Sequence, residues 1–333
     1  MTGVVTLALV LSACGGSTGT TESATSAGDG SSAAEAAETS EAVTEVEVTD
    51  NHGTYTIDVP PTSVVATDNR LFETLADWGI ELAAAPVSLM APDNPYTQDT
   101  TIVDLGNHVE PDLEAVVAAQ PDLILNGQRF AQYYEDLQSL APDAVILELD
   151  PRDGEPFDEE LRRQVEVLGE VFGHEEDAAA LVDAFDAAIA RVEAAYDPSE
   201  TVMAVITSGG TINYAAPSTG RTLGPVFDIL GLTPALEQDG TTDHQGDEIS
   251  VEAIAESNPD WILVMDRDAA VAANSGDEYT PANELIASSE ALVNVTAVQE
   301  GNIVYMPQYT YLDEGIQTYT TFFNALADAM EAN

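Results

Sequence analysis

The chain has 333 residues, of which 60 are acidic and 8 are basic, so its formal net charge at pH 7 is -52. A body this acidic repels polyanions, which excludes nucleic acid and anionic membrane surfaces as partners. Because 44% of the residues are hydrophobic, the chain is not an acidic disordered protein. Its length suits two ordinary cores, since single cores rarely grow beyond about 250 residues.

The N-terminal segment indicates export. An apolar run over residues 1–11 ends in LSACG (residues 11–15), which resembles the lipobox of bacterial lipoproteins, where the cysteine is lipidated. The run is too short to span a bilayer, which needs about 20 residues. We therefore predict a signal peptide over residues 1–14 and lipidation of Cys14. This places the protein outside the cytoplasm, anchored to the outer face of a bacterial cell membrane.

Residues 15–52 are predicted to form a flexible acidic tether, since they consist mostly of Ser, Thr, Ala, Gly and Glu. An N-terminal α/β lobe is predicted over residues 53–155. Short apolar runs bounded by turn residues predict its buried strands. These runs are SVVAT (63–67), ELAAAP (81–86), DLILN (122–126) and AVILEL (144–149).

Residues 156–197 have the longest helical pattern, interrupted near Gly173 and His174. The second part places apolar residues on one stripe; these are Leu181, Phe185, Ile189, Val192 and Tyr196. A C-terminal α/β lobe follows over residues 198–333, with strands TVMAVI (201–206), WILVM (261–265) and NIVYM (302–306) and a final helix near 318–332. The predicted fold class is α/β, with two Rossmann-like lobes joined by one long α-helix and a ligand cleft between the lobes.

An internal repeat links the two lobes. Residues 113–129 read LEAVVAAQPDLILNGQR and residues 251–267 read VEAIAESNPDWILVMDR, with seven of the seventeen positions identical. Each copy carries a glutamate at its second position, Glu114 or Glu252, and ends in an arginine, Arg129 or Arg267. The shared unit is a short helix, a Pro-Asp turn, a buried strand and a terminal arginine, which favours a duplicated lobe.

Four of the eight basic residues precede helix-like segments, namely Arg70, Arg129, Arg221 and Arg267. A helix N-terminus disfavours a cation, but together with arginine forks it makes a good clamp for an anion. We therefore predict that these arginines bind an anionic ligand. The alternative is an ordinary ion pair, because Arg267 lies between two aspartates and Arg70 follows Asp68. Tyr214 is a further candidate, as an aromatic wall of the cleft.

Four segments carry a resemblance to a known family. They are VEPDLEAVVAAQPDLIL, YAAPSTGRTLGPVFDILGL, TTDHQGDEISVEAIAESNPDWILVMDR and NIVYMPQYTYL. From about residue 53 to its end the chain resembles the iron-siderophore solute-binding proteins of ABC importers, in particular binders of ferric catecholate or mixed catecholate siderophores. The resemblance implies two lobes bridged by a single helix.

The resemblance also implies roles for single residues. Arginines matching Arg129, Arg221 and Arg267 contact the catecholate oxygens, and residues matching His244 and Tyr311 complete the iron coordination. Tyr309 is the fallback for Tyr311, because only one of the two faces the cleft if the segment is extended. Glutamates matching Glu114 and Glu252 dock on arginines of the permease in the vitamin B12 members of the family.

We expect a solute-binding component that captures a ferric siderophore outside the cell and delivers it to a membrane permease and its ATPase. The chain has no G-x-S-x-G, no P-loop lysine and no H-E-x-x-H, so no enzymatic activity and no intrinsic cofactor are expected. The alternatives are a haem or cobalamin-type binding protein of the same fold, and a surface sensor or adhesion module.

Overall fold

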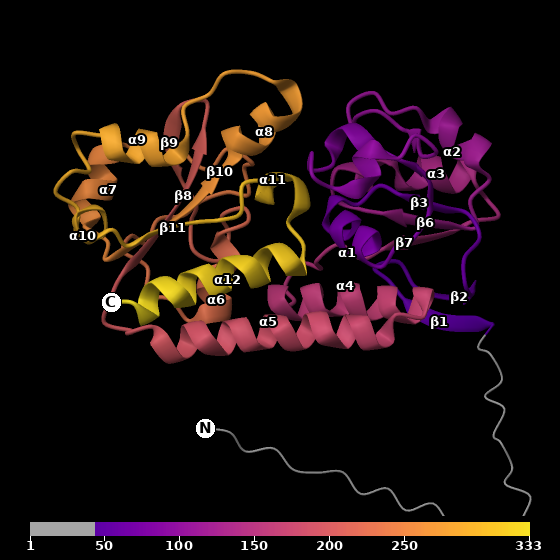
Figure 1. Cartoon of the computed structure of the whole chain (residues 1–333), viewed down its shortest axis with the longest axis horizontal. Helices are drawn as coiled ribbons and strands as arrows, with labels where there is room; N and C mark the ends of the chain where they lie inside the picture. Colours follow the sequence, from indigo (N-terminus) through magenta and orange to yellow (C-terminus); the bar gives the residue numbers. More distant parts are fainter. Residues whose placement is uncertain (1–43) are drawn as a thin grey trace, which may run out of the picture. The chain divides into compact units, whose positions relative to one another are not determined.

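The computed structural model describes residues 44–333, without the side chains of Ala273 and Asn274 (Figure 1). The predicted signal peptide, Cys14 and most of the predicted tether lie outside these residues. The prediction that the tether reaches residue 52 is wrong, because strand β1 (Glu45–Thr49) already pairs antiparallel with β2 (Thr54–Asp58). Both strands alternate polar and apolar residues, and Val48 and Ile57 pack into the first core.

The first lobe is built on five parallel strands in the order β5-β4-β3-β6-β7. They are β3 (Val64–Ala66), β4 (Leu82–Ala85), β5 (Val103–Asp104), β6 (Leu123–Asn126) and β7 (Val145–Glu148). The α-helices of this lobe are α1 (Phe72–Asp77), α2 (Leu113–Ala119) and α3 (Tyr134–Leu140), with 3-10 turns η1 (Asn69–Leu71), η2 (Val87–Leu89), η3 (Pro95–Gln98) and η4 (Gln128–Tyr133). The four predicted strands are confirmed. Strand β5 was not predicted, because it is only two exposed residues long.

The segment predicted as one interrupted helix consists of α4 (Phe157–Phe172) and α5 (Glu175–Ala195). The interruption reverses the chain, because Arg162 of α4 is paired with Asp186 of α5 at 2.7 Å. Gly169 allows the two helices to approach, since a Cβ there would lie 2.8 Å from the Cβ of Ala178. Helix α4 contributes to both main cores, and the predicted apolar stripe of α5 packs into the second.

The second lobe is built on four strands in the order β11-β10-β8-β9. They are β8 (Val202–Ser208), β9 (Thr211–Tyr214), β10 (Trp261–Asp266) and β11 (Ile303–Tyr305); β9 alone runs antiparallel to its neighbour. Gly209 and Gly210 make the β8–β9 turn, and both have the positive φ that glycine tolerates. The helices are α6 (Gly224–Leu230), α7 (Val251–Ser257), α8 (Arg267–Ser275), α9 (Ala282–Ser288), α10 (Thr296–Glu300), α11 (Thr310–Asp313) and α12 (Ile316–Glu331).

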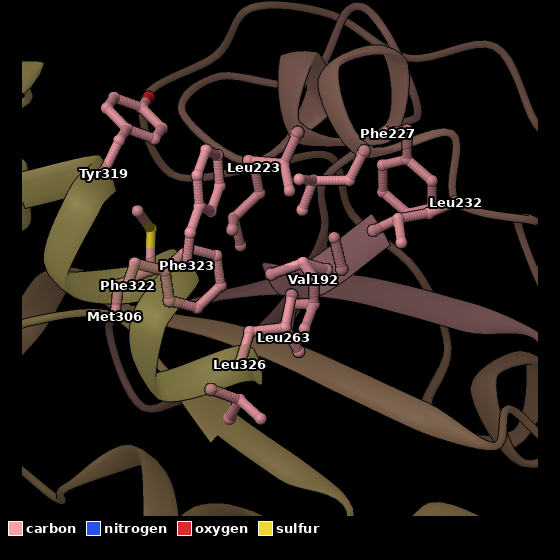
Figure 2. Packing of buried hydrophobic residues seen from close by; sticks show 14 of the residues in the cluster. Val192, Leu223, Phe227, Leu232, Leu263, Met306, Tyr319, Phe322, Phe323 and Leu326 are labelled. Carbon is pink, nitrogen blue, oxygen red and sulfur yellow. The ribbon is translucent and has the colours of Figure 1, made fainter. Parts of the chain in front are cut away.

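The C-terminal helix α12 closes the second core by packing along α5 (Figure 1). Figure 2 shows how its aromatic residues meet side chains from the sheet and from neighbouring helices; the labelled residues include Phe322, Phe323, Leu326, Val192, Phe227 and Leu263. Each such side chain contributes about 1.5–3 kcal/mol when it is fully buried. This core fixes the position of the segment just before α12, which carries Tyr311 and Glu314.

The internal repeat is confirmed as a structural unit, since α2 with β6 and α7 with β10 occupy matching places in the two sheets. The Asp of each Pro-Asp turn holds the segment that enters the neighbouring strand. Asp122 accepts a hydrogen bond from the backbone N–H of Thr62 (2.7 Å), and Asp260 accepts one from that of Thr201 (2.7 Å). The turn thus fixes the register of adjacent strands, and with it the place where each terminal arginine emerges.

Candidate functional site

Three guanidinium groups surround the ring of Tyr311. The Cζ atoms of Arg129, Arg221 and Arg267 lie 4.9, 5.1 and 4.7 Å from the ring centroid. The imidazole of His244 joins them, with its centroid 6.4 Å from that of Tyr311. Arg129 comes from the first lobe and the other four residues come from the second. The structure therefore brings together five predicted site residues, which we call the Tyr311 cluster.

Arg129 and Arg267 reach the Tyr311 cluster without a hydrogen-bonded carboxylate. Arg129 Nη2 donates to the backbone carbonyl of Tyr311 (2.9 Å), and its buried Nη1 has no partner within residues 44–333. Arg267 Nη1 donates to Ser208 Oγ (3.2 Å), whereas Asp268 Oδ1 is 3.9 Å from the same nitrogen and out of hydrogen-bond reach. Both guanidinium groups therefore keep donors and charge for a ligand.

The six other arginines, all in the described part of the chain, each donate to a carboxylate. The pairs are Arg70 with Asp150, Arg152 with Glu160, Arg162 with Asp158, Arg163 with Glu160, Arg191 with Asp328, and Arg221 with Glu314. In a chain with 60 acidic residues a nearby carboxylate is the rule. The two arginines that end the internal repeat are the exceptions.

Arg221 of the Tyr311 cluster and Arg70 of the cleft wall are both paired cations. Arg221 donates through Nε and Nη2 to the two oxygens of Glu314 (3.1 and 2.8 Å). Burial alone would lower the pKa of Arg221, but the Glu314 carboxylate outweighs burial and raises it. Arg70 Nη1 donates to Asp150 Oδ1 at 2.8 Å, so the ion-pair alternative holds for this residue. Arg70 nevertheless lines the cleft beside Arg129.

His244 has the protonation state that a metal ligand requires. It is half-buried, and burial together with the neighbouring Arg267 lowers its pKa. A lowered pKa leaves the imidazole neutral at pH 7, with a lone pair free for iron. The phenol of Tyr311 adds an oxygen donor of the hard type that Fe(III) favours.

The cleft is a cavity of about 940 Å³, at the upper end of the range for small-molecule sites. Its wall combines Arg70, Gln128 and Arg129 of the first lobe, residues 150–158, which end in the first residues of α4, and residues of the second lobe including Arg221 and Thr222. Arg129 and Arg221 belong both to this wall and to the Tyr311 cluster. A ligand that fills the cavity therefore meets these two cations of the cluster.

The prediction that Tyr214 contacts the ligand is wrong. Its side chain is 1% exposed and packs in a core beneath the β8–β9 hairpin, and its hydroxyl donates to the backbone carbonyl of Leu236 (2.7 Å). The burial has a simple cause: β9 alternates, so Ile212 and Tyr214 face inward while Asn213 faces out. Tyr214 is a core residue with a satisfied polar end.

Changing Tyr214 to Phe tests this correction. We expect the free energy of unfolding to fall by about 1 kcal/mol, because one buried hydrogen bond is lost. Ligand affinity should stay within about twofold of wild type, since no part of the ring reaches the cleft. Urea denaturation and calorimetric titration measure the two effects. A large loss of affinity at unchanged stability would return Tyr214 to the site.

The preference for Tyr311 over Tyr309 assumed that the segment carrying both residues is extended, and that assumption is wrong. Residues 310–313 form the short helix α11, with Tyr309 as the residue that precedes it. Tyr311 lies in the cluster, whereas Tyr309 lines a separate cavity of about 450 Å³ together with Glu73 and Asp313. The helical turn, and not strand alternation, separates the two rings.

The sequence favours a turn residue at His108 over a cleft residue and does not single out Glu314; both lie beside arginines of the cleft wall. Burial and the charge of Arg129 lower the pKa of His108, and its buried Nδ1 has no partner in the described part of the chain. Tyr133 donates to the backbone carbonyl of His108 (2.8 Å), which holds this turn beside Arg129. No motif marked Glu314, because its partners lie far away in the sequence.

Glu114 and Glu252 lie outside the cleft. Each is exposed and occupies the second position of its helix, α2 or α7, as the repeat predicts. Their docking role stays a prediction. Within residues 44–333 no helix is long and apolar enough to cross a membrane, and no group of three or more His, Cys, Asp or Glu is arranged to hold a metal ion.

Comparison with known proteins agrees with this geometry. The chain is 26% identical to the petrobactin-binding protein of Bacillus subtilis over 97% of this chain and 96% of the relative. It is 30% identical to the ferric-anguibactin-binding protein of Vibrio anguillarum over 68% and 70% of the two chains. The fold is shared with the periplasmic catecholate-siderophore binding protein of Vibrio cholerae, with a TM-score of 0.72 and 22% identity over 87% of this chain and 100% of that one.

A family model described as periplasmic binding protein matches residues 64–310, which include both repeat copies and every member of the Tyr311 cluster except Tyr311 itself. The match spans most of the chain and both sheets. These are binding proteins, and the two-lobe α/β fold predicted from the sequence is the fold they share. The chain belongs to the periplasmic binding protein family.

Proposed function

We propose that the protein captures a ferric siderophore of the catecholate or mixed catecholate type and delivers it to an ABC importer. One observation carries the proposal: in a chain of net charge -52, Arg129 and Arg267 meet at Tyr311, and neither has a hydrogen-bonded carboxylate among residues 44–333. A buried cation is unfavourable unless it has a partner, so this pair is best explained by an anionic ligand.

A ferric catecholate fits the cluster chemically. Its oxygens carry a net negative charge around a hard cation, and arginine forks donate to paired oxygens. Where the siderophore leaves coordination positions open, His244 and Tyr311 supply a neutral nitrogen and a phenol oxygen to iron. Diffuse attraction by the whole protein is absent at this net charge, so the local cluster supplies the attraction. The names of the relatives, which bind petrobactin, ferric anguibactin and ferric enterobactin, support the same ligand class.

Delivery rests on features outside the cleft. The exposed Glu114 and Glu252, one on each lobe, are suited to dock on basic residues of a permease that works with its ATPase. Lipidation of Cys14 would anchor the protein at the outer face of the cell membrane. Residues 156–197 then link an N-terminal lobe, ending at residue 155, to a C-terminal lobe over 198–333. Binding and release need no catalysis and no intrinsic cofactor.

Tryptophan fluorescence tests the ligand class. The protein is titrated with the ferric complex of a synthetic tris-catechol and, separately, with haem, while the emission of Trp78 and Trp261 is followed. We expect saturable quenching by the ferric complex at micromolar concentration or below, and none by haem. The iron-free tris-catechol serves as the control for nonspecific quenching. Quenching by haem alone would favour the haem-binding alternative and overturn the proposal.

A further inference from the structure

Glu314 is a buried carboxylate that lies behind the cleft wall, hydrogen-bonded to three residues that line the cavity. It is 4% exposed and accepts hydrogen bonds from three side chains. Arg221 and Thr222 donate from the second lobe, and Gln128 Nε2 donates from the first at 3.1 Å. Burial alone would raise the pKa of Glu314, but Arg221 outweighs it and lowers that pKa to about 2. Glu314 is therefore an anion at every physiological pH.

The chain brings Glu314 to this place through a close approach of the two lobes. Gly315 follows it, and a Cβ there would lie 2.6 Å from the backbone oxygen of Arg70. Beside it, Asn69 Nδ2 donates to the backbone carbonyl of Leu312 (3.0 Å). A carboxylate held by both lobes has a fixed position relative to any ligand between them.

Glu314 changes the charge that a ligand meets. Four arginines face the cleft or the cluster, but Asp150 neutralises Arg70 and Glu314 neutralises Arg221. Only Arg129 and Arg267 remain without a hydrogen-bonded carboxylate. The cleft thus presents about two uncompensated positive charges instead of four.

We propose that Glu314 is a specificity-determining residue: it limits how strongly the cleft favours highly charged ferric complexes, while it holds the Arg221 fork in place for the ligand. The inference rests on the proposed function, since it concerns the charge of the same ligand. The two unpaired charges of Arg129 and Arg267 balance a complex with one or two negative charges. The cleft binds a trianionic complex less tightly than a cleft with four unpaired arginines would.

The experiment uses two ferric complexes of similar octahedral shape. A synthetic tris-catechol gives a complex of charge -3, and a tris-hydroxypyridinone on the same scaffold gives a neutral one. Calorimetric titration yields the ratio of the two affinities for each variant. In Glu314→Gln the affinity for the trianion relative to the neutral complex should rise on the order of tenfold. The reason is that the variant removes one negative charge near the ligand, in surroundings of low effective dielectric constant.

Two further variants separate charge from structure. The double variant Arg221→Gln/Glu314→Gln removes both members of the pair, so its ratio should fall back to the wild-type value or below. Glu331→Gln is the matched control, because Glu331 accepts the same two-pronged bond from Arg191 (3.2 and 2.9 Å) at the far end of α12. Its ratio should equal that of wild type.

The outcomes are distinguishable. A wild-type protein that binds neither complex refutes the proposed function. A wild type that binds the trianion, with an unchanged ratio in Glu314→Gln, overturns the role of Glu314 alone. A raised ratio that persists in the double variant also overturns it, since the effect would then come from cleft shape. If Glu314→Gln does not fold, Arg221→Gln is measured instead, and its ratio should fall by on the order of tenfold or more; an unchanged ratio there counts against the inference.

Discussion

Replacing Arg129 and Arg267 together with glutamine is expected to lower the affinity for a ferric tris-catecholate by about a thousandfold. A hydrogen bond to a charged group is worth about 1.5–3 kcal/mol, so losing one from each arginine removes about 3–6 kcal/mol of binding free energy. Each single variant should lose about ten- to a hundredfold. Calorimetric titration of wild type, the two single variants and the double variant with the ferric complex measures these losses.

The same double variant should be at least as stable as wild type. Arg129 and Arg267 lie close to one phenol ring, repel one another and have buried nitrogens without partners in the described residues. Removing two such cations relieves repulsion in the free protein. Thermal unfolding therefore separates the loss of binding from any loss of fold, because a structural role for these arginines would lower the melting temperature.

The control for the single variants is Arg191→Gln. It changes the net charge by the same amount as each of them, but Arg191 is paired with carboxylates on α12, outside the cleft wall and the Tyr311 cluster. Its affinity should stay within about threefold of wild type. An affinity loss equal to that of the single variants Arg129→Gln and Arg267→Gln would mean that net charge, and not the cluster, governs binding.

The sequence predicted the positions of Arg129 and Arg267 because their positions depend on local structure. Each arginine follows a Pro-Asp turn and a short buried strand, and it stands where the next helical segment begins. The aspartate of the turn holds the neighbouring strand, so these local features determine where the arginine leaves the sheet. The same short-range rules predicted seven of the strands and the apolar stripe of α5. Each of these features can be read within a window of about twenty residues.

The remaining parts of the site depend on partners that are distant in the sequence. Arg221 and Glu314 are 93 residues apart, and no local pattern says that the one neutralises the other. The core position of Tyr214 follows from the pairing of β9 with β8 in a hairpin, and β9 is not among the strands predicted from the sequence. Hydrogen-bond partners across lobes decide which arginines stay free, and they become visible only when the lobes are folded together.

Changing Asp68 to Asn is expected to stabilise the protein at pH 8 by about 1–3 kcal/mol, with no gain at pH 4. Asp68 is fully buried, its Oδ1 accepts from the backbone N–H of Arg70 (3.0 Å), and its Oδ2 has no partner in the described part of the chain. Burial and the nearby Asp150 raise its pKa from 3.8 to about 7. An asparagine reproduces the neutral form of the side chain.

The sign follows from proton counts. Between pH 4 and 7 the folded protein holds a proton on Asp68 that the unfolded chain has released, so the contribution of Asp68 to stability falls as pH rises through that window and is constant above it. The gain of Asp68→Asn over wild type must therefore grow from pH 4 to pH 7 and then level off. Urea denaturation at pH 4, 5.5, 7 and 8 measures this curve.

Asp122→Asn gives the control of opposite sign. Partial burial would raise the pKa of Asp122, but hydrogen bonds from Thr62 and Ser63 outweigh burial and lower it. Its carboxylate therefore contributes stability above pH 4 that is lost as pH falls, so the asparagine variant should be less stable than wild type at pH 8, with the difference shrinking toward acid pH. If Asp68→Asn showed the same direction as Asp122→Asn, then Asp68 would be ionised in the folded protein, and Arg70 would hold two carboxylates beside the cleft instead of one.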